Sequence, residues 1–454
     1  MLNLSENKKN DLIVNIKIGV FFDGTGLNAN NITLKKPEDE YLYSNIYRLY
    51  KHYGKNYDEK EKDVYLKVYV EGVGTKNNEK NNIVVMATGI DNLVSHGWGA
   101  FSKYNNSVND VSQIIGNYLK TKSIKNYHLD ITFDVFGFSR GAAIARHFTN
   151  KVAKQDTFFI EKIRAAIEPY SCSLVSRPSV NFLGLFDTVA SIWSLHGDPH
   201  DTGYTNELDV NLGPKVAGQV FQITAMHECR YNYPLSSLEG FYPQLELAGA
   251  HSDIGGGYAA YESDRSEITD TFYYIPFSSS VEERMTNDIN LLREDKRWNK
   301  LLHDWKPNIH LDGVFGWGEV KKNVRGDLQF VSLLIMAGCA EKYGCSFDSG
   351  IIDKYEMKIT ENLNPYYKSA LINMDSVLSD MPQKIPQTLI DNITDEYIHV
   401  SSTWRLLGDD DEVINKNIEL RSTLSIQEST IDEIFTMRPD ENWNRKKYLN
   451  DQPI

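Results

Sequence analysis

A serine framed by two glycines lies between a predicted strand and a predicted helix. It belongs to the sequence GFSRG at 137–141, which follows an apolar stretch and precedes the alanine-rich residues 142–152. A G-x-S-x-G sequence at such a turn is typical of a nucleophile elbow, where the glycines leave room to lift the serine hydroxyl clear of the sheet. We therefore predict that Ser139 is a nucleophile and that Gly137 and Gly141 shape its turn. The alternative is an ordinary turn with an incidental serine.

A serine nucleophile needs a base to accept its proton, and the base needs a carboxylate to orient it. Two candidates follow Ser139 in the chain order acid, then histidine, that is typical of α/β-hydrolases. Asp187 ends the predicted strand NFLGLFD, 48 residues after Ser139, and His251 follows the predicted strand LELAGA, 64 residues after Asp187. The sequence therefore predicts a catalytic triad of Ser139, Asp187 and His251.

The residue types leave other interpretations of these two positions open. Aspartate is also common at turns and helix N-caps, so Asp187 is compatible with a structural role. Histidines are often partly buried and hydrogen-bonded, which gives His251 the same alternative. His399, in the sequence YIHVS, is the alternative base, because a triad is assembled by geometry and not by distance along the chain.

The sequence DGTG at 23–26 ends the first predicted strand. We predict that the backbone N–H group of Gly24 or Thr25 joins that of Arg140 in an oxyanion hole, assisted by the N-terminus of the helix after Ser139. The same sequence is compatible with a simple turn. An aspartyl-phosphate mechanism would need the pattern D-x-D-G-T, and Phe21 occupies its first position.

The elements that must position these residues are predicted from apolar runs separated by helical stretches. Strands are expected at residues 12–22, 64–70, 129–136, 180–186, 220–225 and 245–248, and helices at 108–119 and 142–152. This alternation predicts an α/β fold of the α/β-hydrolase type, a mostly parallel sheet flanked by helices. Reactive groups in such sheets gather beyond the carboxyl ends of the strands, where the candidate residues lie.

The pattern changes beyond about residue 262, where helical stretches at 280–302 and 327–343 dominate. We therefore predict a catalytic domain with helical insertions over residues 12–345. A mainly helical C-terminal subdomain is predicted over residues 346–454.

Composition limits the class of partner and the compartment. The formal net charge is −14 at pH 7, which argues against nucleic-acid binding, because phosphate contacts need clustered Lys and Arg. The N-terminal sequence has no apolar core of a signal peptide, so we expect synthesis in the cytoplasm. No metal or other cofactor is expected, because the four cysteines and the histidine-rich loop 196–201 lack a regular ligand spacing.

Several segments together resemble one family, the α/β-hydrolase-like phospholipase effectors of bacterial type VI secretion, in their first lipase-effector class. In order along residues 14–260, they are GVFFDGTGLNANN, YVEGVGT, FGFSRGAAIAR, FLGLFDTVASI, AMHECRYNYPL and LAGAHSDIGGGY. The later segments DLQFVSLLIMAGCAEKYG and YIHVSS match more loosely.

This resemblance implies a serine lipase that hydrolyses acyl ester bonds of glycerophospholipids, with Ser139 as nucleophile, Asp187 as acid and His251 as base. It also implies delivery into a rival cell, to its periplasm or membrane, by a secretion apparatus whose spike protein is a partner. The substrate would be a phospholipid membrane, and an immunity protein would protect the producer.

Three other hypotheses are compatible with the residues. One keeps the serine chemistry on a non-lipid ester, thioester or peptide. Another is a non-catalytic binding protein that retains the fold. The third is metal-dependent hydrolysis that uses Asp23, Asp187, His251 and Asp253.

Overall fold

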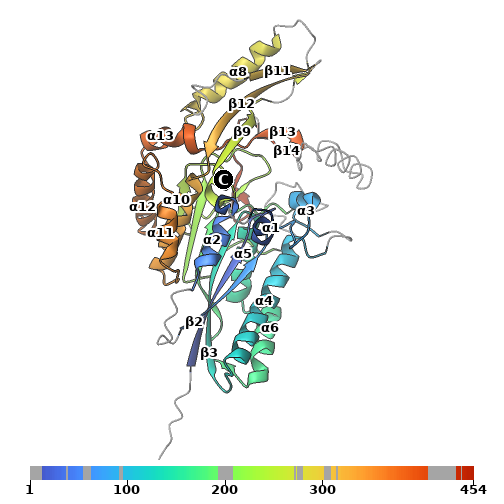
Figure 1. The fold of residues 1–454 in the computed structure, drawn as a ribbon, viewed down its shortest axis with the longest axis vertical. Coiled ribbons are helices and arrows are strands. Elements are labelled where there is room, and N and C mark those ends of the chain that lie inside the picture. Colours follow the sequence, from blue (N-terminus) through green and yellow to red (C-terminus); the bar gives the residue numbers. More distant parts are fainter. Residues whose placement is uncertain are drawn as a thin grey trace, which may run out of the picture.

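The computed structural model describes residues 13–36, 39–54, 63–91, 96–192, 208–269, 272–273, 280–300, 308–312, 315–406, 436–440 and 442–454. The histidine-rich loop 196–201 lies outside these residues. The structure is elongated, with a central sheet and helices on both of its faces (Figure 1).

The central sheet has seven strands in the order β2-β1-β3-β5-β6-β8, with β4 paired to β3, and every pairing is parallel. The strands are β1 (Ile13–Phe22), β2 (Asp63–Val70), β3 (His128–Phe138), β4 (Ser173–Leu174), β5 (Ser179–Phe186), β6 (Gln219–Ala225) and β8 (Gln244–Leu247). All six predicted strands are present. The predicted α/β fold, a mostly parallel sheet flanked by helices, is confirmed.

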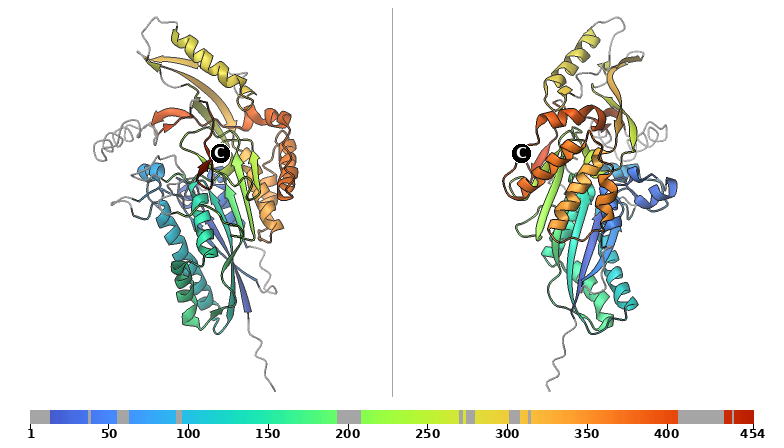
Figure 2. Two further views of the ribbon diagram at one scale, coloured as in Figure 1. Left: turned by 180° about the vertical axis from the view of Figure 1, so that it is seen from behind. Right: turned by 60° about the vertical axis from the view of Figure 1, so that its left-hand side comes forward.

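Two apolar cores lie on opposite faces of the sheet, because successive side chains of a strand point to opposite faces. At the end of β1, for example, Phe22 belongs to one core and Phe21 to the other. The first core is covered by α4 (Ala100–Thr121), α5 (Arg140–Ala153) and α6 (Thr157–Ile167). The second is covered by α2 (Asn45–His52) and α10 (Leu328–Lys342), and the two groups of helices are seen on opposite sides in Figures 1 and 2.

An antiparallel sheet lies beyond the central sheet, in a region where helical stretches were expected to dominate. It consists of β9 (Tyr261–Glu267), β10 (Phe272–Tyr273), β11 (Asn308–Asp312) and β12 (Phe315–Arg325) and lies beside α8 (Ser280–Glu294) (Figure 1). The predicted helices are present as α8 and α10. The strands were missed because the sequence of β9, YESDRSE, is almost entirely polar and carries no apolar alternation.

The C-terminal part is mainly helical up to Tyr397, as predicted, and then returns to the central region as short strands. It contains α11 (Gly350–Glu356), α12 (Asn364–Leu378), α13 (Gln387–Tyr397), β13 (Thr403–Leu406), β14 (Thr436–Met437), β15 (Lys447–Leu449) and β16 (Gln452–Pro453). Strand β15 pairs in parallel with β7 (Leu235–Ser236), which follows β6. The division into domains at residues 345 and 346 stays a prediction.

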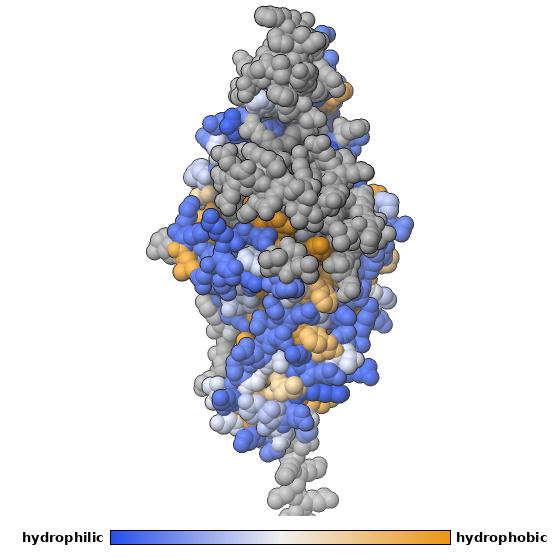
Figure 3. All heavy atoms as spheres, turned by 90° about the vertical axis from the view of Figure 1, so that its right-hand side faces the viewer, coloured by the Kyte–Doolittle hydropathy of each residue, from blue (hydrophilic) through white to orange (hydrophobic). Residues whose placement is uncertain are grey.

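The remaining helices are short and lie in loops of the central region. They are α1 (Ala29–Lys35), η1 (Glu40–Leu42), α3 (Ile83–Thr88), η2 (Glu168–Tyr170) and α7 (His251–Gly255). Among the described residues, no helix combines the length and the apolar character needed to cross a membrane. The described residues on the face shown in Figure 3 are mostly hydrophilic, with small separate groups of apolar side chains.

The turn from β3 into α5 depends on two glycines that face backbone atoms. A Cβ atom at Gly137 would lie 2.6 Å from Ala142 Cα, and one at Gly141 would lie 2.3 Å from the carbonyl oxygen of Asp23. Backbone cannot move aside as a flexible side chain can, so the first turn of α5 packs directly on the end of β1. The two glycines of the predicted elbow are therefore required by packing.

We expect Gly141→Ala to lower the free energy of unfolding by about 2 kcal/mol or more, because overpacking a rigid site forces the backbone apart. Gly338→Ala is the matched control, since a Cβ atom at that position of α10 would meet nothing within 4 Å. It should raise the stability by up to ~1 kcal/mol through helix propensity. Urea unfolding of both variants measures the difference, and equal stabilities would contradict the packing argument.

Candidate active site

Ser139 and Asp187 are placed side by side by the register of two neighbouring parallel strands. Phe138 ends β3 and Phe186 ends β5, and these two residues are partners in the sheet. The residues that directly follow them are Ser139, the predicted nucleophile, and Asp187, the predicted acid. The N–H group of Ser139 donates to the carbonyl oxygen of Phe186 at 3.1 Å, which joins the two strand ends.

Ser139 adopts a strained backbone conformation at the turn from β3 into α5. Its φ is 58° and its ψ is −128°, a backbone region that residues with a side chain rarely occupy. Ser139 directly precedes the first residue of α5. Such strain is the mark of a nucleophile elbow. Ser139 is only 4% exposed, so a group that reaches its hydroxyl must enter a largely closed site.

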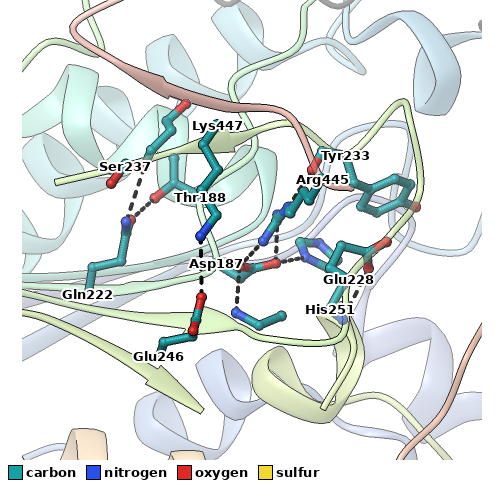
Figure 4. A network of polar contacts seen from close by, with 12 residues as sticks. Asp187, Thr188, Gln222, Glu228, Tyr233, Ser237, Glu246, His251, Arg445 and Lys447 are labelled. Carbon is teal, nitrogen blue, oxygen red and sulfur yellow. Dashed lines mark hydrogen bonds and ion pairs between the residues drawn. The ribbon is translucent and has the colours of Figure 1, made fainter. Parts of the chain in front are cut away.

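His251 begins α7, which follows the edge strand β8, and its ring lies on the elbow. The ring centroid is 4.6 Å from that of Phe138, the residue before Ser139. Its Nδ1 atom lies 2.5 Å from Oδ2 of Asp187, and because a carboxylate only accepts, Nδ1 carries the proton (Figure 4). The other ring nitrogen, Nε2, is buried and makes no hydrogen bond within the described part of the chain. This is the nitrogen that a serine proton would need.

Asp187 is fully buried, and its carboxylate accepts more than the bond from His251. The guanidinium of Arg445 grips it as a fork, with Nη1 donating to Oδ1 at 2.6 Å and Nη2 donating to Oδ2 at 2.9 Å (Figure 4). The N–H group of Ala225, at the end of β6, donates to Oδ1 at 3.0 Å. Burial by itself would raise the pKa of Asp187, but the charge of Arg445 and the bond from His251 outweigh it and hold the pKa well below its ordinary value.

The environment of His251 keeps its imidazole neutral. Burial lowers the pKa of His251 below its ordinary value of 6.5, and the opposing effects of the Asp187 and Glu228 carboxylates do not reverse this shift. Glu228 follows β6; it accepts the backbone N–H group of His251 at 3.2 Å and is paired with Arg230 at 2.6 Å. A neutral imidazole with a free, unprotonated Nε2 is the form in which histidine acts as a general base.

The loop after β1 approaches the elbow and contains two of the predicted oxyanion-hole donors, Gly24 and Thr25. The N–H group of Gly24 already donates a hydrogen bond to Oδ1 of Asp23 at 2.7 Å. Within the described part of the chain, the backbone N–H groups of Thr25 and Arg140 donate no hydrogen bond. The Arg140 side chain ties the two segments together, because its Nε donates to Oγ1 of Thr25 at 2.8 Å. Of the predicted oxyanion-hole donors, this favours Thr25 and Arg140 over Gly24.

His399, the alternative base, is paired with a different carboxylate. Its Nδ1 lies 2.7 Å from Oδ1 of Asp253, and its ring is stacked on Tyr258. Asp253 also accepts the N–H group of Ala250, the residue before α7, at 2.9 Å. His399 thus supports the start of the helix that carries His251, and it is not placed against Asp187.

Sequence reasoning missed Arg445 and the contact of Glu228 with the backbone of His251. Arg445 lies 258 residues after Asp187, in a polar C-terminal stretch without a recognisable motif. Glu228 and Arg230 lie inside the segment AMHECRYNYPL that contributed to the family resemblance, which is the one signal that pointed toward them.

The residues invoked for metal-dependent hydrolysis are engaged in other contacts. Asp187 binds Arg445 and His251, Asp253 binds His399, and Asp23 accepts the Tyr69 hydroxyl at 2.6 Å. In the part of the chain that the structure describes, no three His, Cys, Asp or Glu side chains are grouped so that they could hold a metal ion.

Together the parallel sheet, the strained elbow and the buried Asp–His pair give the molecule an α/β-hydrolase-like architecture. Residues 17–157, which run from β1 through Ser139 into α6, match the family described as the catalytic domain of Tle1-like phospholipase effectors of type VI secretion. This confirms the predicted resemblance over that segment. The match does not extend to Asp187 or His251.

Comparison with solved structures extends the likeness in fold to nearly the whole chain. The structure of the Tle1 effector bound to the VgrG spike of the type VI secretion system superimposes with a TM-score of 0.76, at 24% identity, over 97% of this chain and 95% of the other. An uncharacterized protein from Pseudomonas aeruginosa gives a TM-score of 0.41 at 14% identity, over 95% of this chain and 65% of the other. A search of curated proteins found no match.

The predicted role of His251 as the base requires a neutral imidazole, so labelling of Ser139 by a fluorophosphonate should follow the titration of His251. The lowered pKa of His251 predicts that the labelling rate reaches half of its maximum at a pH below 6.5 and is constant at higher pH. His251→Gln should slow labelling by about 10³-fold. The labelling rate, followed by mass spectrometry of the Ser139 peptide, measures both effects.

His399→Gln is the control that separates the two candidate bases. A folded His399→Gln protein should still be labelled. Loss of labelling in that variant together with normal labelling of His251→Gln would assign the base to His399 instead.

Proposed function

We propose that this protein is a serine phospholipase that hydrolyses acyl ester bonds of glycerophospholipids. The observation that carries the proposal is the buried 2.5 Å contact between His251 and Asp187, placed against the elbow that holds Ser139 in a strained conformation. This combination is costly for a protein that needs only stability, because it concentrates backbone strain and buried charge in one place.

In the proposed reaction, Ser139 Oγ attacks the acyl carbonyl carbon while Nε2 of His251 takes the hydroxyl proton. The N–H groups of Arg140 and Thr25 hydrogen-bond the negative oxygen that forms, and Asp187 stabilises the imidazolium. Collapse breaks the ester bond, and His251 returns the proton to the leaving alcohol, a lysophospholipid. A water molecule, activated by the same histidine, then releases the fatty acid from Ser139.

The substrate class is supported by the family match rather than by the site geometry. Residues 17–157, which include Ser139, match a catalytic domain named for phospholipase effectors. The triad by itself fits any acyl ester or thioester. We therefore infer a glycerophospholipid as substrate from the family and an acyl transfer to Ser139 from the contacts.

The same comparisons support a role as a secreted antibacterial effector. The structural relative was solved in complex with a VgrG spike, so we infer that a spike protein of a secretion apparatus carries this chain as well. The target would be the membrane of a rival cell, reached from the periplasm or from the membrane itself. An immunity protein in the producing cell completes this proposal.

Replacing the nucleophile tests the reaction directly. We expect Ser139→Ala to lower the hydrolysis of defined phospholipid vesicles by about 10³-fold or more, since no other group replaces the hydroxyl. Ser176→Ala is the matched control, because Ser176 is exposed and precedes β5, at the end of the strand opposite to Asp187. Mass spectrometry of the products should show a lysophospholipid and a fatty acid.

Other outcomes of that experiment distinguish the alternatives. Hydrolysis of short acyl esters or thioesters without any hydrolysis of phospholipid would place the same chemistry on a non-lipid substrate. Unchanged activity in Ser139→Ala would end the proposal. An unreactive Ser139 in the folded protein would indicate a binding protein that retains the fold.

A further inference from the structure

The C-terminal residues 442–449, here called the C-terminal strap, lie against the segment that surrounds His251. The strap adds β15 in parallel to β7, and the N–H groups of Leu235 and Ser237 donate to its carbonyl oxygens at 2.8 and 2.7 Å. At its start, the buried ring of Trp443 packs edge-on against Trp298 at 5.4 Å. The strap is therefore fixed on both sides of Arg445.

Arg445 points from the strap into the active site, as Figure 4 shows. Its side chain is only 3% exposed, and three of its N–H groups are used. Two form the fork on Asp187, and Nε donates to the backbone oxygen of Tyr233 at 2.7 Å. The ring of Tyr233 in turn meets that of His251 edge-on at 4.9 Å. One guanidinium thus joins the acid to the segment beside the base.

We propose that Arg445 is a positioning residue of the acid–base pair, which fixes the Asp187 carboxylate toward His251 and offsets its negative charge. This inference rests on the proposed function, in which Asp187 and His251 act on Ser139. A fork of two parallel hydrogen bonds defines the plane of a carboxylate, whereas a single bond leaves it free to rotate. The fork therefore holds Oδ2 toward Nδ1 of His251, together with the bond that Oδ1 accepts from the N–H group of Ala225.

The charges around His251 show why the offset matters. Two carboxylates face the imidazole, Asp187 from the end of β5 and Glu228 from the loop after β6, and each is paired with one arginine, Arg445 and Arg230 respectively. The rings of Tyr233 and Phe138 also pack against the imidazole. With both arginines present, the formal charges balance, and burial keeps the imidazole neutral. Without Arg445, one unpaired carboxylate would favour the imidazolium and raise the pKa of His251.

The test compares Arg445→Gln with Arg445→Lys in the full chain, using a soluble short-acyl ester over a range of pH. Arg445→Gln should lower kcat by about tenfold or more with KM little changed. The acid limb of its pH–rate profile should move up by about one pH unit. Arg445→Lys keeps the charge but not the fork. It should therefore keep the acid limb of the wild type while kcat still falls.

Lys447→Gln is the matched control, because it removes one positive charge from the same strap at a side chain that contacts Glu246 and not the site. Its pH profile should equal that of the wild type. An unmoved acid limb in folded Arg445→Gln would overturn the proposal. A Lys447→Gln protein whose acid limb shifts as far as that of Arg445→Gln would also overturn it. So would an Arg445→Lys protein with the kcat of the wild type, and this measurement decides the question if Arg445→Gln does not fold.

A second readout separates this proposal from the proposed function. NMR titration of protein labelled with ¹³C in histidine gives the pKa of His251 without any turnover, with His251→Gln used to assign the signal. A rise of about one unit in Arg445→Gln supports the positioning role even if no ester is hydrolysed. An unchanged pKa of His251 contradicts it even if the wild type is an active lipase.

Discussion

The arrangement depends on one buried carboxylate staying ionised and correctly oriented. Asp187 has no exposed surface, and a carboxylate in such a place would take up a proton if it lacked partners. Its partners are the fork of Arg445, the N–H group of Ala225 and the imidazole of His251. These bonds keep the negative charge where it can stabilise an imidazolium. Each comes from a different part of the chain, so the site exists only once the whole molecule has folded.

The parallel sheet brings these parts of the chain together, and the elbow at Ser139 lies at the end of its strand β3. Ser139 and Asp187 are adjacent because β3 and β5 end in register, and His251 joins them from beyond the edge strand β8. The strain at Ser139 is held by direct packing of Gly141 on the end of β1. Arg445 of the C-terminal strap reaches the Asp187 carboxylate from a further segment of the chain. Backbone strain and buried charge, each unfavourable alone, are thus stabilised by the surrounding core.

The sequence predicted most of the central fold and the local motifs, because apolar strands and a glycine-framed serine carry strong local signals. The GFSRG elbow, and the strand ends before Asp187 and His251, could be placed without a structure. The polar strand β9 could not, since its residues show no apolar alternation. Arg445 could not either, because its role arises from a contact across 258 residues. Whether His251 or His399 faces Asp187 was likewise a question of geometry, and the structure pairs His399 with Asp253.

The most direct test of this account is a crystal structure of the protein after reaction with a phosphonate that mimics the tetrahedral intermediate. The account predicts phosphorus bonded to Ser139 Oγ, with the phosphoryl oxygen about 2.7–3.1 Å from the N–H groups of Arg140 and Thr25. Nε2 of His251 should face the leaving-group side while Nδ1 keeps its bond to Asp187. An adduct on another residue, or an imidazole of His251 that points away from Ser139, would contradict it.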